Sequence, residues 1–189
     1  MTDPAETEPL IVADVHAWRA WLDQNESTSD GLWVLLAKKG TVSPTSLNYQ
    51  HALEEALCSG WIDGQRKSVD AHTFKQRYTP RRAKSLWSLR NIDIVARLRA
   101  EGRMRDRGFA EIERAKSDGR WDRAYAGPAT AEVPTELAAA LEAQPAAGAA
   151  FAALNRTENY SALHPILTAA SEKTRDQRIA RLLERLRVS

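Results

Sequence analysis

The sequence predicts an α+β fold, with a small antiparallel or mixed sheet of about three strands packed with helices in the N-terminal part and an all-helical C-terminal part. Two observations indicate this fold class. Between residues 31 and 80, short apolar or alternating segments are bounded by glycine and proline, which is typical of strands. After Ser85, apolar residues recur at helical spacing almost to the C-terminus. We therefore expect two units, residues 1–126 and residues 127–189, with a linker that begins at Gly127.

The first elements follow from local patterns. A helix is expected after Asp14, because aspartate caps helix N-termini, and Trp18 and Leu22 continue it at helical spacing. The apolar run of residues 32–37 is short and follows a glycine, which favours a buried strand. A second helix is expected to end at Gly60, because glycine readily adopts the left-handed conformation that terminates helices.

A hairpin is predicted from residues 61–67 and 74–79, which are separated by a polar turn. Alternate side chains of its second strand should point to opposite faces of the sheet. Phe74, Gln76 and Tyr78 share one face, and Lys75 and Arg77 share the other. One basic face of the sheet is therefore expected to remain exposed to solvent.

The segments after Ser88 are predicted to be helical. Gly102 and Gly119 are expected to end the first two of these helices, and Pro134 suits the first turn of a third. Pro145 either ends that third helix or begins an alanine-rich one. The run Thr174-Arg175-Asp176-Gln177 has the form of a capping box, so it is predicted to open the last helix.

Composition limits the class of protein. The chain has 189 residues, with 27 Lys and Arg against 25 Asp and Glu, for a formal charge of +2. No apolar run approaches the roughly 18 residues that a membrane span requires. The acidic N-terminal segment MTDPAETEPL is unlike a secretory signal, and one cysteine cannot form an intramolecular disulfide. We therefore expect a cytoplasmic protein without a membrane span.

Basic residues are concentrated in one stretch. Between residues 66 and 90, eight basic residues stand against Asp70 alone, which leaves a local charge of +7. The basic residues are Arg66, Lys67, Lys75, Arg77, Arg81, Arg82, Lys84 and Arg90. Such an excess indicates either an anionic partner or a solvated face whose counter-charges come from elsewhere in the fold.

Familiar catalytic and metal-binding patterns are missing from the sequence. Cys58 and His51 would lie about 10 Å apart along a helix, too far for a nucleophile and its base, so Cys58 is expected to be a small buried apolar residue. Glu54 and Glu55 are adjacent, so they diverge by about 100° on a helix and cannot act as a paired acid and base. No glycine-rich phosphate loop or nucleophile elbow occurs. No two of the histidines have metal-binding spacing; they are His16, His51, His72 and His164. We expect no metal, no cofactor and no catalytic residue, although an enzyme assembled from distant residues stays open.

The candidate binding residues lie between Leu57 and Asn91, where aromatic and basic residues are crowded. Arginine can fork onto a carboxylate or phosphate, and aromatic rings can stack on a planar ligand. The predicted ligand-binding residues are Asp63, Arg66, Arg77, Tyr78, Arg81, Arg82, Lys84, Trp87 and Asn91. Trp61 is a further candidate for stacking.

Each of these assignments has a structural alternative. We favour a core position for Trp61 and Trp87, because large aromatic side chains usually supply buried area. Asp63 either orients an arginine or pairs internally. For Arg77, Arg81 and Arg82, ligand binding and internal ion pairing remain equally open.

Several motifs resemble the YdeI/OmpD-associated family of bacteriocin-protection proteins. They are Cys58-Ser59-Gly60-Trp61-Ile62-Asp63-Gly64, Gln76-Arg77-Tyr78-Thr79-Pro80-Arg81-Arg82, Ser85-Leu86-Trp87-Ser88-Leu89-Arg90-Asn91, Ala115-Lys116-Ser117-Asp118-Gly119-Arg120-Trp121 and Thr174-Arg175-Asp176-Gln177-Arg178-Ile179. The resemblance covers nearly the whole chain after the first dozen residues, and the helical C-terminal part resembles the OmpD-associated domain. It implies a role in tolerance of bacteriocins or cationic antimicrobial peptides, without an agreed biochemical activity.

Two functional hypotheses follow. The first is a non-enzymatic stress-tolerance protein that acts by binding a protein partner or an anionic ligand. The alternative is a module that binds nucleic acid or a nucleotide phosphate through residues 66–91, with an affinity that falls as salt rises.

Overall fold

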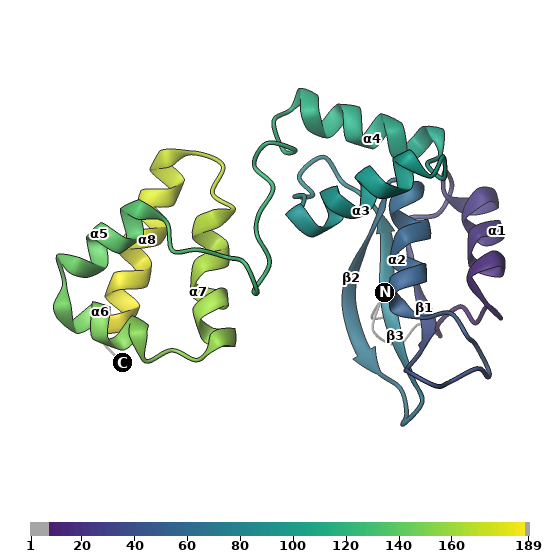
Figure 1. The fold of residues 1–189 in the computed structure, drawn as a ribbon, viewed down its shortest axis with the longest axis horizontal. Coiled ribbons are helices and arrows are strands. Elements are labelled where there is room, and N and C mark those ends of the chain that lie inside the picture. Colours follow the sequence, from purple (N-terminus) through teal and green to yellow (C-terminus); the bar gives the residue numbers. More distant parts are fainter. Residues whose placement is uncertain (1–7, 188–189) are drawn as a thin grey trace. The chain divides into compact units, whose positions relative to one another are not determined.

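A computed structural model describes residues 8–187 of the chain, and these residues form eight helices and three strands (Figure 1). The strands lie in the N-terminal part and the last four helices form the C-terminal part, so the predicted α+β fold class is confirmed. In chain order the elements are α1 (Val15–Asn25), β1 (Leu32–Ala37), α2 (Tyr49–Cys58), β2 (Trp61–Ser68), β3 (Thr73–Pro80), α3 (Leu89–Ala100), α4 (Asp106–Ser117), α5 (Thr135–Glu142), α6 (Pro145–Ala152), α7 (Arg156–Leu167) and α8 (Glu172–Arg187).

The described residues divide into two compact units. The N-terminal unit comprises residues 8–85 and 93–119, and the C-terminal unit comprises residues 86–92 and 120–187. Each unit has a hydrophobic core of its own. The candidate sites below each lie within one unit.

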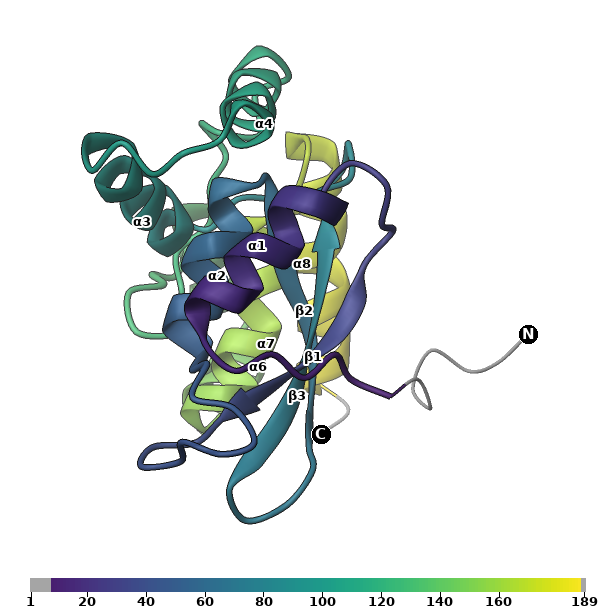
Figure 2. The ribbon, with the colours of Figure 1, turned by 90° about the vertical axis from the view of Figure 1, so that its right-hand side faces the viewer.

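The sheet of the N-terminal unit is antiparallel, with the strand order β1-β3-β2. On β3, Phe74, Gln76 and Tyr78 are buried, so the predicted hairpin and the alternation of its side chains are confirmed. Lys75 and Arg77 are half-buried, so the basic face is only partly exposed to solvent, because Trp33 of β1 packs on the same face. Helices α1 and α2 lie side by side against the sheet (Figure 2). They bury the apolar face of β1 and β3 in one core.

Local sequence explains where these helices begin and how they pack. The Asp14 carboxylate accepts hydrogen bonds from the backbone N–H groups of His16 and Ala17, which caps α1 as predicted. The indole N–H of Trp18 donates to the Ala52 carbonyl of α2 at 3.1 Å, so the two helices are joined inside the core. Gly60, with a φ of +70°, ends the turn after α2, as expected from its position.

The C-terminal unit packs its helices around a core of leucine, isoleucine and phenylalanine. The sequence predicts a helical C-terminal part but does not identify α7 as a separate helix, because Pro165 lies inside it. Its start is nevertheless marked by a capping box in which Asn155 and Glu158 each bond the other's backbone N–H. The predicted start of the last helix at Thr174 is wrong: α8 begins two residues earlier, and the Ser171 hydroxyl accepts from the Thr174 N–H.

Candidate anion-binding site

A hollow of about 250 Å³ in the N-terminal unit is lined by three arginines. The arginines are Arg81, Arg107 and Arg114, and the other lining residues are Gly60, Ala110 and Glu111. Three guanidinium groups and one carboxylate give this lining a charge of +2. We refer to it below as the arginine hollow.

Two segments that are distant in sequence supply the arginines. Arg81 follows β3 directly, is 5% exposed, and its backbone N–H donates to the Gly60 carbonyl at 3.1 Å. Arg107, Glu111 and Arg114 come from α4, at positions i, i+4 and i+7 of one helix. This spacing places them on one face of α4, turned toward Arg81.

Glu111 organises the basic groups of the hollow. Its side chain is 5% exposed and accepts a hydrogen bond from the Arg114 guanidinium, which also donates to the Arg81 carbonyl at 3.3 Å. A buried carboxylate of this kind holds arginines in a fixed geometry, which lowers the entropy that a ligand must remove. Arg107 is partly buried, whereas Arg114 is exposed and pairs with Glu111, so both can reach a ligand in the hollow.

Helix α4 reaches this position because two glycines allow a close approach. A Cβ atom at Gly108 would lie 2.2 Å from the Cys58 carbonyl oxygen, and one at Gly60 would lie 3.0 Å from the Arg107 carbonyl oxygen. A Cβ atom at position 108 is therefore incompatible with this packing. The motif that contains Cys58 and Gly60 thus forms the surface on which α4 is seated.

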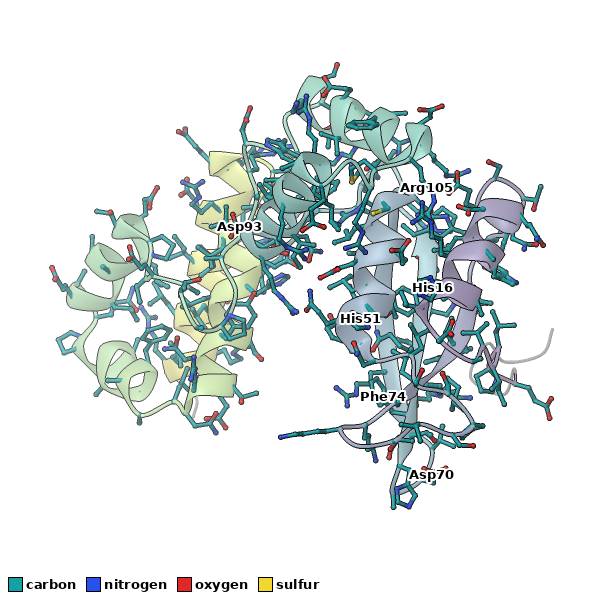
Figure 3. All side chains as sticks on the ribbon, turned by 45° about the vertical axis from the view of Figure 1, so that its right-hand side comes forward. His16, His51, Asp70, Phe74, Asp93 and Arg105 are labelled. Carbon is teal, nitrogen blue, oxygen red and sulfur yellow. The ribbon has the colours of Figure 1, made fainter. Side chains whose placement is uncertain are left out.

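Arg105, at the N-terminus of α4, anchors that helix to α1 and α2. Its guanidinium donates to the Glu55 carboxylate at 3.0 Å, the Asp23 carboxylate at 2.6 Å and the Ser59 hydroxyl at 3.1 Å. Figure 3 shows Arg105 where α1, α2 and α4 meet. The pair with Glu55 is largely buried, with side chains 12% and 5% exposed. Removal of one partner from such a pair is strongly destabilising.

A second set of ion pairs surrounds Glu54. Arg103 bridges the two adjacent carboxylates, donating to Glu54 at 3.0 Å and to Glu55 at 2.7 Å, and Arg97 also pairs with Glu54. Burial of the Glu54 carboxyl by itself raises its pKa, but hydrogen bonds from Gln50 and the two arginines outweigh burial and lower the pKa below its ordinary value. The two glutamates are therefore linked through one shared arginine, Arg103, although they diverge on α2.

Of the predicted ligand-binding residues, the arginine hollow contains Arg81 alone. Arg77 is half-buried on β3 opposite Trp33, and Arg82 and Lys84 are exposed. The Arg66 guanidinium lies 3.8 Å from the centre of the Phe74 ring, so it covers the edge of the core. Trp87 and Asn91 are buried in the C-terminal unit.

The predicted stacking residues lie in the protein interior. Trp61 and Tyr78 are 0% exposed and Trp87 is 1% exposed, which agrees with the favoured interpretation of the tryptophans as core residues. Asp63 pairs internally: it accepts a hydrogen bond from the Tyr49 hydroxyl at 2.8 Å and lies opposite Tyr78 in the sheet. Burial and the nearby Asp63 carboxylate raise the pKa of Tyr78 far above its ordinary value. These rings are therefore not exposed for stacking on a ligand.

Sequence reasoning did not find Arg107, Glu111 and Arg114. The pattern that points to them is a basic, acidic, basic run at helical spacing in a segment already expected to be a helix. This pattern does not indicate that Arg81 lies opposite these three residues of α4. Arg81 and α4 come together only because α4 packs at Gly60.

Cys58, the single cysteine of the chain, is buried in the core. Burial raises the pKa of the Cys58 thiol to about 11, so Cys58 is a neutral core residue at neutral pH. Within residues 8–187, no group of three or more histidine, cysteine or acidic side chains is arranged to hold a metal ion. In the same part of the chain, every helix is too short or too polar to cross a membrane.

Comparison with known families divides the chain in two. Residues 10–111 match a family described as a domain of unknown function (DUF8412), and this match spans more than half of the 189 residues. Residues 130–188 match the family described as bacteriocin-protection, YdeI or OmpD-associated, which confirms the resemblance for the helical C-terminal part. The arginine hollow lies largely in the first match, whose description gives no activity. No curated protein and no solved structure matches the chain.

Proposed function

Because the chain belongs to the DUF8412 family and ends in a bacteriocin-protection, YdeI or OmpD-associated domain, we propose that it contributes to bacteriocin protection by binding an anionic ligand at the arginine hollow. In this proposal, the chain is a non-enzymatic stress-tolerance protein that acts in the cytoplasm. Its C-terminal domain suggests the biological role, and its N-terminal unit supplies the ligand site.

The observation that carries this proposal is the convergence of Arg81, Arg107 and Arg114 on one hollow. Elsewhere in the N-terminal unit, Arg103 and Arg105 each pair with carboxylates inside the fold. In the hollow, the lining supplies one carboxylate, Glu111, for three guanidinium groups. The excess positive charge favours an anion, and the planar guanidinium fork suits the oxygens of phosphate and carboxylate.

The size of the hollow limits the ligand. Sites for drug-sized molecules usually have volumes of about 300–1,000 Å³, whereas this hollow has about 250 Å³. The ligand that fits it is therefore a small anion, or the charged end of a larger molecule. Inorganic pyrophosphate is a suitable probe, because it presents several acceptor oxygens in a small volume.

Isothermal titration of the full chain with pyrophosphate tests the proposal. We expect saturable binding to the wild-type protein, and a loss of affinity of roughly tenfold or more in Arg107→Gln, because one charge-assisted hydrogen bond is removed. Arg82→Gln is the matched control, since Arg82 is an exposed arginine of the same basic stretch and lies outside the hollow. Binding that is absent, or equal in the wild-type protein and Arg107→Gln, contradicts the proposal.

The alternative function, binding of nucleic acid through residues 66–91, draws on the exposed bases Arg66, Lys67, Arg82 and Lys84. The aromatic residues of this stretch do not assist it, because they are buried. It predicts that a single-stranded oligonucleotide binds with an affinity that falls steeply with salt, and that Arg82→Gln weakens this binding. Equal losses of pyrophosphate affinity in Arg82→Gln and Arg107→Gln favour this alternative.

A further inference from the structure

The C-terminal unit contains a second basic site, in the groove between α7 and α8. Two hollows of about 250 and 270 Å³ lie along these helices and share Ser161 and Arg185 in their linings. The two hollows adjoin at these shared residues, and we refer to them together as the groove between α7 and α8. Helices α7 and α8 lie side by side along it (Figure 1).

The floor of this groove is apolar. Ala162 and Ile166 of α7 and Leu182 of α8 line the first hollow, and Leu154 lines the second. Pro165 contributes an exposed apolar ring to the same surface. Ala162, Ile166 and Leu182 are at most 4% exposed, so the apolar surface that can receive side chains of a partner comes mainly from Pro165 and the partly buried Leu154.

Three arginines of α8 form one side of the groove. Arg178, Arg181 and Arg185 stand at positions i, i+3 and i+7 and line the first hollow, which has no acidic residue in its lining. They extend over roughly 10 Å of the helix. Between residues 178 and 187, four arginines stand against Glu184 alone, which leaves a charge of +3. This edge is therefore complementary to a row of carboxylates.

The arginines are not equivalent. The Arg178 guanidinium donates to the Pro165 carbonyl, so it is held across the groove near the floor. Arg181 is exposed in the middle of the row. In the second hollow, the Glu158 carboxylate accepts from the Asn155 backbone N–H as part of the capping box of α7. Glu158 therefore has a structural role at the far end of the groove.

We propose that the groove between α7 and α8 binds an acidic amphipathic helix of a protein partner. The apolar side of the partner helix lies on the floor, and its carboxylates face the row, with the exposed Arg181 as the main contact. Arg178 and Arg185 add positive charge on either side of Arg181 while they keep contacts within the protein. Acidic residues at i, i+3 or i+4 and i+7 of the partner match the spacing of this row. A nucleic acid could contact the arginines, but its phosphates would leave the apolar floor unused. The proposal is independent of the arginine hollow in the N-terminal unit.

Fluorescence anisotropy with a labelled synthetic peptide tests this proposal. The peptide has the length of α8, 16 residues, with glutamates at the spacing given above and leucine and alanine on the adjoining face. A peptide of the same composition in scrambled order and a single-stranded oligonucleotide of equal charge are the comparison ligands. We expect the full chain to bind the amphipathic peptide more tightly than either of them, because only this peptide uses both the floor and the row.

Charge reversal at the middle of the row provides the matched variants. Arg181→Glu is expected to weaken peptide binding roughly tenfold or more, because a like charge then faces the partner's carboxylates. Arg156→Glu makes the same change at an exposed position of α7 outside the groove lining, and it should leave binding unchanged. Circular dichroism checks that both variants are folded. The proposal is overturned if the amphipathic peptide does not bind, if the scrambled peptide or the oligonucleotide binds as well, or if the two variants lose affinity equally.

Discussion

Substitution of Gly108 by alanine tests the packing on which the arginine hollow depends. The added Cβ atom would lie 2.2 Å from the Cys58 carbonyl oxygen, and Cβ contacts below 3.0 Å are essentially never seen, so α4 must move by at least about 0.8 Å. Overpacking of this kind costs about 1–3 kcal/mol. Inside a helix, alanine by itself stabilises the folded state by about 1 kcal/mol relative to glycine. We therefore expect a net destabilisation of up to about 2 kcal/mol, or a fall in Tm of up to roughly 8 °C.

Thermal and urea unfolding followed by tryptophan fluorescence measure this effect, and pyrophosphate titration measures its consequence for the hollow. Arg107 is adjacent to Gly108 on α4, so displacement of the helix should also weaken binding. Gly127→Ala is the control, since a Cβ atom there meets nothing within 4 Å. If Gly108→Ala is as stable as the wild-type protein and binds pyrophosphate equally well, the close approach of α4 to Cys58 is not what positions the hollow.

Three further outcomes concern buried polar side chains of the N-terminal unit. Arg105→Gln should reduce the free energy of unfolding by about 3 kcal/mol in urea titrations, because it removes one partner of the buried pair with Glu55; an unchanged midpoint contradicts this. The pKa of Glu54 is lowered in the folded protein, so its contribution to stability is present above pH 4.5 and is lost as the pH falls through the folded pKa. Glu54→Gln should therefore flatten the pH dependence of unfolding below pH 4.5, and an unaltered pH profile argues against the ion pairs. With a pKa of about 11, the buried Cys58 thiol should resist alkylation at pH 8 until urea unfolds the protein, and rapid labelling of the native protein would show that Cys58 is accessible.

The elements that the sequence predicts best are those with strong local patterns. The strand at residues 32–37 and the hairpin were predictable because apolar runs and alternation occur between glycine and proline boundaries. The end of α2 was predictable because Gly60 supplies the positive φ that the turn needs. Helix α7 was not predicted as a separate element, since Pro165 interrupts the helical pattern and the capping box at Asn155 was not recognised as its start.

The candidate site was predictable only in part. Arg81 was predictable as a binding residue, because it lies in a stretch with a large local excess of basic residues. Arg107 and Arg114 lie in a segment of mixed charge, and they reach Arg81 only because α4 packs on the end of α2. The buried pairs of Glu54 and Glu55 with arginines were missed for the same reason: their partners lie more than 40 residues away in the sequence.

The most direct test of the account is nuclear magnetic resonance of the arginine side chains during a titration with pyrophosphate at constant ionic strength. The Nε–H resonances of Arg81, Arg107 and Arg114 are expected to shift together along one saturable curve, while that of the exposed Arg82 stays in place. Resonances of the three arginines that do not move, or that move no further than that of Arg82, would contradict the claim that they form one anion site.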